Sequence, residues 1–118
     1  MNHARLLAFV AAGSFLLSSA TALAQTDPKK VERAWKAKCS SCHGAAGKGD
    51  TEKGQQMKIV DMTTPAFQAK KDDELKKAIN EGVKTEKGGV KQEMDAFKGD
   101  LTPEQVDALI AYVRAFKK

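Results

Sequence analysis

The sequence predicts a small all-α domain in which three main helices are joined by long loops. Three observations carry this prediction. Three segments combine capping residues with apolar residues at helical spacing, and the strand patterns of a β-α-β unit are absent. The 118 residues are 42% hydrophobic and 30% charged, which is the composition of one globular domain. The net charge of +5 is spread along the chain, so a nucleic-acid-binding tail is not expected.

The first 24 residues are typical of an export signal. Arg5 provides a positive start, residues 6–17 form an apolar run, and Ala22-Leu23-Ala24 is a small-x-small cleavage site. The apolar run is short for a bilayer span, although an uncleaved N-terminal anchor is the alternative. We therefore expect an exported mature chain, residues 25–118, with no transmembrane segment and with a net charge of +4 after loss of Arg5.

The first helix is expected to begin at Pro28 and to end near Cys39. Asp27 is placed to cap this helix, and proline suits a first helical turn. Its apolar face consists of Val31, Ala34 and Trp35. A second helix is expected over about 72–81, with Gly82 as a natural stop. Its apolar stripe consists of Leu75, Ala78 and Ile79.

The third helix has the clearest signals. Thr102 is its expected cap, Pro103 takes the first turn, and Gln105 completes a capping box. Leu101 can pack against Val106 as a hydrophobic staple. The amphipathic face consists of Val106, Leu109, Ile110 and Val113.

The connections over residues 44–64 and 83–100 are long for so small a domain. We expect both to be irregular, including the stretch after Gly88-Gly89. A large apolar cofactor inside the loops would account for their length, because a chain this short buries only a modest core by itself. The first connection contains four glycines, Gly44, Gly47, Gly49 and Gly54. They could permit tight backbone turns beside such a group, and the alternative is an ordinary solvent-exposed loop.

Both cysteines lie in one pentapeptide, Cys39-Ser40-Ser41-Cys42-His43. C-x-x-C-H is the attachment signature of haem c, in which two thiols form thioethers with one porphyrin and the adjoining imidazole is the proximal iron ligand. A Cys39–Cys42 disulfide or a thiol redox site would leave His43 unexplained. A zinc site is poorer still, because it would have only three ligands. We predict one covalent haem c on Cys39 and Cys42, with His43 on the iron.

Met94 is the expected distal ligand. His3 is lost with the export signal, so the mature chain has no second imidazole. A thioether binds low-spin iron and raises its reduction potential. Met94 follows His43 by 51 residues, which allows it to reach the opposite haem face, whereas Met57 and Met62 follow by only 14 and 19. These two methionines, and a lysine, are the alternatives.

The mature chain resembles the small class I c-type cytochromes of the bacterial periplasm over about residues 30–116. The segments that carry the resemblance are Trp35-x-x-x-Cys39-Ser40-Ser41-Cys42-His43-Gly44, Met94-Asp95-Ala96-Phe97 and residues 101–113. The resemblance implies an all-α cytochrome c fold wrapped around one haem, with the N- and C-terminal helices crossing so that Trp35 lies near Leu109 and Tyr112. It implies that the haem is held by Cys39, Cys42, His43 and Met94.

With both axial positions filled, the iron has no open site and can only exchange one electron. We therefore expect a periplasmic one-electron carrier and no enzyme activity. The alternatives are a non-catalytic haem subunit of a dehydrogenase or oxidase and, less favoured, a thiol-disulfide oxidoreductase that uses Cys39 and Cys42. Burial of the haem beneath Phe67 and Phe97 is expected to raise the reduction potential.

The expected partners are redox proteins with acidic docking surfaces. Lysines flank the attachment motif on both sides, namely Lys36, Lys38, Lys48, Lys53 and Lys58. A basic ring around the haem edge would steer acidic partners, although a plain solvated surface is the alternative. Nothing in the sequence indicates nucleic-acid binding or oligomerisation, and we expect a monomer. The sequence does not identify the acceptor for the His43 imidazole N–H.

Overall fold

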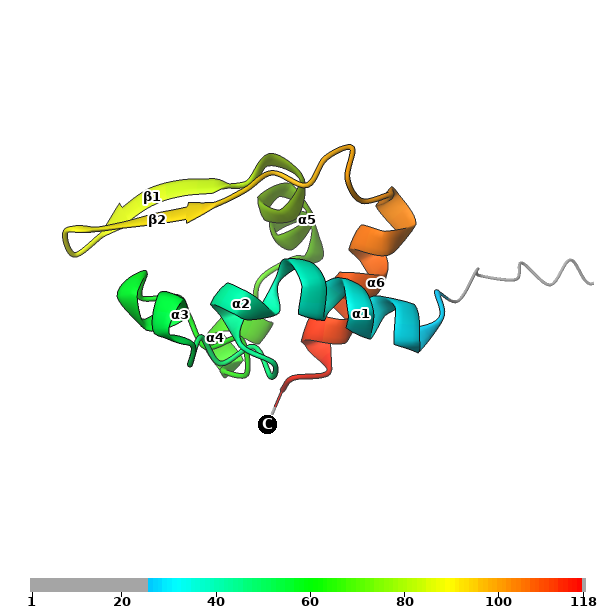
Figure 1. Cartoon of the computed structure of the whole chain (residues 1–118), viewed down its shortest axis with the longest axis horizontal. Coiled ribbons are helices and arrows are strands. Elements are labelled where there is room, and N and C mark those ends of the chain that lie inside the picture. Colours follow the sequence, from blue (N-terminus) through cyan, green and yellow to red (C-terminus); the bar gives the residue numbers. More distant parts are fainter. Residues whose placement is uncertain (1–25, 118) are drawn as a thin grey trace, which may run out of the picture.

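The computed structural model describes residues 26–117, so the export signal predicted for residues 1–24 lies outside the described residues. Within residues 26–117 the chain forms six helices and one two-stranded sheet (Figure 1). In chain order these elements are α1 (Pro28–Lys38), α2 (Ser40–His43), α3 (Glu52–Gln56), α4 (Pro65–Gln68), α5 (Asp72–Glu81), β1 (Val83–Lys87), β2 (Val90–Met94) and α6 (Pro103–Arg114). The three longest helices are the three that the sequence predicts.

The first and last helices pack against each other, as Figure 1 shows for α1 and α6. Trp35 of α1 is 3% exposed. Its ring centroid lies 5.8 Å from that of Tyr112 and 5.2 Å from that of Phe116. The Asp27 carboxylate accepts from the backbone N–H of Lys29 at 2.9 Å, which caps the start of α1. The predicted helix and its predicted aromatic contact with Tyr112 are confirmed.

The start of α6 carries the predicted capping box. The Thr102 hydroxyl accepts from the Gln105 backbone N–H at 3.3 Å, and the Gln105 side chain accepts from the Thr102 backbone N–H at 2.8 Å. Leu101 and Val106, the expected staple pair, are both buried. These interactions satisfy N–H groups that a helix start otherwise leaves unpaired.

The hydrophobic core lies between α1, α5, α6 and the chain segment around α4. Its buried side chains are Val31, Trp35, Met62, Phe67, Leu75, Leu101, Val106, Leu109, Ile110 and Val113. The predicted apolar face of α6 is therefore the face that is buried. Ile79 of α5 packs against the same cluster, and α5 ends at Gly82, as predicted.

Two polar side chains connect the α4–α5 region to the last turn of α6. The Arg114 guanidinium donates to the carbonyl of Gln68 at 2.9 Å and to the carboxylate of Asp72 at 2.7 Å. The Gln68 amide donates to the carbonyls of Met62 at 2.7 Å and Val113 at 3.0 Å. These bonds fix α4, and with it Phe67, against α6.

The expectation of an all-α fold is wrong in one respect, because part of the 83–100 connection forms a hairpin. β1 and β2 pair antiparallel, with Val83 opposite Met94 and Lys87 opposite Val90. The turn is the pair Gly88-Gly89, with φ values of 56° and 73°. Two consecutive residues at positive φ suit a tight hairpin turn that matches the strand twist. Met94 therefore ends a strand and does not lie in an irregular stretch.

The 44–64 connection also contains a helix that the sequence did not predict. Thr51 caps α3, since its hydroxyl accepts from the Gly54 N–H at 2.9 Å. The same hydroxyl donates to the Cys42 carbonyl at 3.1 Å. Gly54 is buried, and a Cβ there would lie 2.4 Å from the Cys42 carbonyl oxygen. Gly54 lies within α3 and is not at positive φ, so the close approach of backbone to backbone, and not a tight turn, requires this glycine.

Candidate functional site

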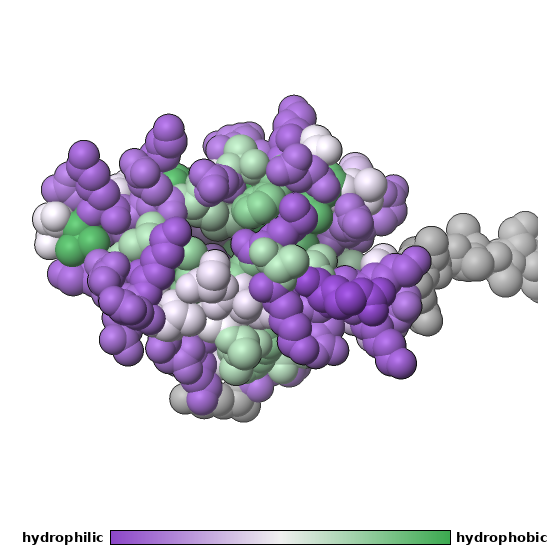
Figure 2. Space-filling view, viewed as in Figure 1, coloured by the Kyte–Doolittle hydropathy of each residue, from purple (hydrophilic) through white to green (hydrophobic). Residues whose placement is uncertain are grey.

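Two adjoining cavities of about 290 and 180 Å³ lie between the α2 segment and the strand β2. The side chains that line both cavities are Cys39, His43, Val60, Val83, Met94 and Phe97. The outer cavity also reaches Cys42 and Met57, and the inner one reaches core residues such as Trp35 and Phe67. Figure 2 shows apolar surface at the middle of this face, surrounded by hydrophilic side chains. The arrangement suits a large, mostly apolar group with one exposed edge.

The two cysteines reach the cavity from the junction of α1 and α2. Cys39 ends α1 and precedes the first residue of α2, and Cys42 follows within α2. Residues three apart on a helix lie on one face. Both cysteines are free thiols, and both are half-buried. Burial raises the pKa of Cys39 to about 11, so this thiol stays protonated at neutral pH.

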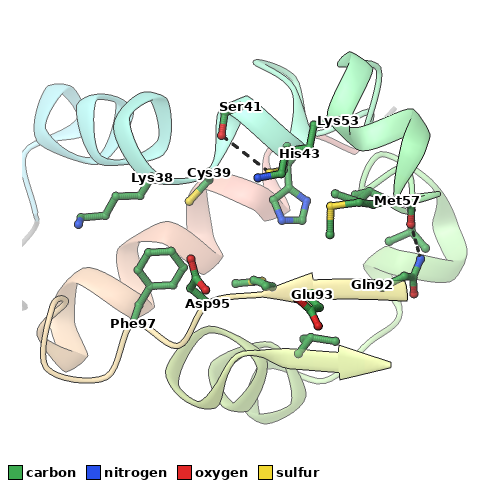
Figure 3. Close-up of a pocket in the computed structure, with 15 residues that line it drawn as sticks. Lys38, Cys39, Ser41, His43, Lys53, Met57, Gln92, Glu93, Asp95 and Phe97 are labelled. Atoms are coloured by element: carbon green, nitrogen blue, oxygen red, sulfur yellow. Dashed lines mark hydrogen bonds between the residues drawn. The ribbon is translucent and has the colours of Figure 1, made fainter. Parts of the chain in front are cut away.

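The imidazole of His43 points into the cavity, beside Met57 (Figure 3). Burial lowers the pKa of His43, which favours the neutral ring. Its Nδ1 atom is buried and has no hydrogen-bond partner within the described chain. A neutral, desolvated imidazole is the form that ligates metals.

The backbone around His43 is held by its neighbours. The Trp35 indole N–H donates to the Gly44 carbonyl at 3.2 Å. The Gly49 N–H donates to the His43 carbonyl at 2.8 Å. The centroids of the Trp35 and His43 rings lie 6.0 Å apart. Contacts from α1 and from the following loop therefore set the direction of the imidazole.

The opposite wall of the cavity is formed by the end of β2 and the residues after it. Gly82 packs so closely against Met94 that a Cβ there would lie 2.5 Å from the Met94 carbonyl oxygen. The Phe97 N–H donates to the Ile79 carbonyl at 2.9 Å. The Lys38 ammonium lies 5.8 Å from the centre of the Phe97 ring, within the range of a cation–π contact. Helix α5 therefore supports the backbone on both sides of Asp95.

The structure brings the predicted site residues together. Cys39, Cys42, His43 and Met94 all line the outer cavity. The two alternative methionines differ from Met94. Met57 lines only the outer cavity, and Met62 lines only the inner one, where it is 8% exposed within the core.

The five predicted basic residues do not form one ring around the cavity. Lys38 and Lys53 line the outer cavity. Lys36 instead forms an ion pair with Glu32 one turn earlier on α1, at 2.6 Å. Within residues 26–117 we find no cluster of three or more His, Cys, Asp or Glu side chains positioned for a metal ion.

Sequence reasoning missed five residues that line the outer cavity, namely Ile59, Val60, Val83, Gln92 and Glu93. Val60 is 44% exposed, which is unusual for a large apolar side chain in this structure. The alternation of Val90, Gln92 and Met94 after a glycine pair is the signal that could have revealed the strand. In this strand Val90, Gln92 and Met94 are half-buried, whereas the residues between them, Lys91 and Glu93, are exposed.

A family model described as Cytochrome c matches residues 28–117. The chain belongs to the cytochrome c family. Members of this family carry covalent haem c and transfer electrons through its iron, and a domain of about 90 residues accommodates one haem. The predicted resemblance to small class I c-type cytochromes is therefore confirmed.

A solved structure described as "KustC0563 c-type cytochrome" is similar to this cytochrome c. The two chains are 33% identical, and the match covers 74% of this chain and 96% of the other, with a TM-score of 0.60. No curated protein matched the sequence. No helix within residues 26–117 is long and apolar enough to cross a bilayer.

The residues of the cavity fit haem c. Two free thiols, a buried imidazole with an unpartnered nitrogen and a thioether converge on one cavity. The two thiols and the imidazole are the groups that covalent attachment of haem c uses, and a thioether can be the second iron ligand. The apolar side chains of the inner cavity provide the surface against which a porphyrin can be buried.

Proposed function

We propose that this cytochrome c is an exported, periplasmic one-electron carrier with a single haem. In this proposal Cys39 and Cys42 form the two thioethers, and His43 and Met94 ligate the iron. The observation that carries the proposal is that His43 and Met94 line both cavities, one from α2 and the other from the end of β2. A flat group that extends through both cavities would therefore meet both side chains.

The haem supplies an iron that changes its oxidation state by one electron. His43 contributes a neutral nitrogen ligand, because its burial disfavours protonation. Met94 would hold the iron through its thioether, which would leave no free coordination site for an external ligand. Phe67, Phe97 and their apolar neighbours exclude water, which disfavours the extra charge of the ferric state and raises the reduction potential.

Met94 is a better axial ligand than the other two methionines. Met62 is already part of the core, and its backbone is bound on both sides, to Gly47 and to Gln68. Met57 follows α3 immediately and lies beside His43, but it lines only the outer cavity. Met94 alone among the three lines both cavities.

The thiol-disulfide alternative has no support in the site. Redox-active cysteines carry a lowered thiol pKa, whereas burial raises that of Cys39 to about 11. The family match likewise supports haem-based electron transfer. The proposal of export rests on the sequence of residues 1–24, and the mass of the mature protein tests it.

The axial assignment can be tested with the ferric holoprotein. Met94→Ala should abolish the charge-transfer band of methionine-ligated ferric haem and lower the reduction potential, because a thioether favours ferrous iron. Met57→Leu and Met62→Leu are matched controls that should retain the band. Loss of the band in either control, with retention in Met94→Ala, would assign the ligand to that other methionine.

We further propose that the carrier meets acidic partner proteins at the exposed edge of the outer cavity. The edge carries charges of both signs, and all four of its charged residues are exposed. Lys38 and Lys53 lie on the α1 and α3 side, whereas Glu93 and Asp95 lie at the end of β2. The proposal concerns the side that carries the two lysines. Opposite charges steer encounters between proteins, and salt screens this effect. A monomeric carrier would use the face in Figure 2, where apolar surface is surrounded by hydrophilic side chains.

A further inference from the structure

One side chain on the hairpin is bound to a distant part of the chain. The amide of Gln92 donates to the carbonyl of Met57 at 2.8 Å and to the carbonyl of Lys58 at 2.9 Å. Figure 3 shows Gln92 beside Met57, with one of these bonds drawn. The bonds join residues 35 and 34 positions apart, so they connect strand β2 to the corner that follows α3.

The corner that accepts these bonds has an unusual conformation. Lys58 has a φ of 49°, and it is the only residue other than glycine with a positive φ in the part of the chain that the structure describes. A left-handed conformation costs about 1–2 kcal/mol for an ordinary residue. Such a conformation persists where surrounding contacts hold it, and the Gln92 amide is one of those contacts.

Gln92 and Met94 lie on the same side of β2. Side chains two residues apart in a strand point to one face, and both residues are half-buried and line the outer cavity. A displacement of Gln92 would therefore move Met94 in the same direction.

The hairpin has few other attachments. β1 and β2 pair with each other, and neither packs broadly against a helix within residues 26–117. A two-stranded hairpin is marginally stable by itself in water. At the base of the hairpin, Gly82 touches the Met94 backbone. Further along β2, the Gln92 amide forms two hydrogen bonds to residues outside the hairpin, and at the turn the Lys58 ammonium lies close to Gly88.

We propose that Gln92 is a positioning residue for the axial ligand. Its amide fastens β2 to the 57–58 corner and so holds Met94 toward the iron. Without these two bonds, the hairpin would move away from the 57–58 corner more often and carry Met94 away from the iron. The iron would then be open to other ligands for a larger fraction of the time. This inference rests on the proposed His43/Met94 ligation.

The test is a titration of the ferric holoprotein with imidazole, followed by loss of the methionine charge-transfer band. The variants are Gln92→Ala and the isosteric Gln92→Glu, which keeps the side-chain shape but cannot donate when ionised. Imidazole should bind about tenfold more tightly to each variant, equivalent to about 1.4 kcal/mol. Binding tightens because Met94 competes less well. Lys91→Ala, one residue away and exposed, is the control and should stay within about twofold of wild type.

A structural role alone would lower the melting temperature followed by far-UV circular dichroism without a selective gain in imidazole affinity. The proposal is overturned if both Gln92 variants bind imidazole like wild type, or if Lys91→Ala gains as much. In either case a band that depends on Met94 would leave the axial assignment intact. If the band depends on another methionine, or wild type lacks it, both proposals are overturned.

Discussion

Gly82 provides a direct test of how α5 supports the strand that carries Met94. It has a φ of 75°, and an added Cβ would lie 2.5 Å from the Met94 carbonyl oxygen and 3.0 Å from the Ala96 nitrogen. Gly82 combines a φ of 75° with a ψ of −178°, a conformation that essentially only glycine adopts. Gly82→Ala therefore adds about 1–3 kcal/mol for this backbone conformation and about 1–3 kcal/mol for the forced shift of packed backbone. We expect the free energy of unfolding to fall by about 2–6 kcal/mol, the sum of these two costs.

The matched control for this substitution is Gly89→Ala. Gly89 has a φ of 73°, nearly that of Gly82, but an added Cβ there would meet no atom within 4 Å. The control should therefore show only the backbone cost of about 1–2 kcal/mol. For a domain of about 90 residues, each kcal/mol corresponds to about 5 °C in melting temperature. Thermal unfolding of the two holoproteins checks the difference. Equal losses would show that the close approach to Met94 carries no strain, and the reasoning would fail.

Two further predictions concern the proximal side and the cavity edge. Trp35→Phe leaves the buried Gly44 carbonyl without its hydrogen-bond donor. The free energy of unfolding, measured in urea, should fall by about 2–4 kcal/mol because of the unpaired carbonyl and the smaller ring. A fall of less than about 0.5 kcal/mol would contradict the proposed role of this bond. Lys53→Glu should slow electron transfer to an acidic redox protein severalfold at low salt and little at high salt. Lys77→Glu makes the same charge change on α5, away from the cavity lining, and should have little effect; equal slowing by both would indicate net charge alone.

The three long helices, α1, α5 and α6, could be predicted from the sequence because their signals are local. The capping box at Thr102 and Gln105 involves residues three apart, and each side chain reaches only one turn of the chain. The stop at Gly82 is equally local. The attachment motif was predictable for the same reason, because Cys39, Cys42 and His43 are adjacent in the sequence and the chemistry of the cofactor fixes their spacing.

The hairpin has weaker local signals, and they are confined to β2 and the glycine pair before it. Four of the five residues of β1 are exposed, so the strand lacks the alternation of apolar and polar side chains that indicates a strand. What holds it is the left-handed pair Gly88-Gly89 together with the long-range bonds of Gln92. In the sequence, Gln92 lies between Lys91 and Glu93, a pattern that is typical of a solvent-exposed position. Only the folded chain places its amide against the 57–58 corner.

The contacts around Met94 bear on the reduction potential as well as on ligation. The Met94 carbonyl touches Gly82, the Phe97 N–H is bound to Ile79 of α5, and Gln92 is bound beyond the strand to the 57–58 corner. A thioether raises the potential only while it remains on the iron. If Met94 ligates the iron as proposed, each of these attachments restricts the ligand backbone and would reduce the fraction of time for which the iron lacks its thioether. Weakening any of them should therefore lower the potential as the open form becomes more populated, even though none of these groups would touch the iron. Under the proposed ligation, the potential would depend on how firmly a mostly polar hairpin is held in place, and not on the cavity lining alone.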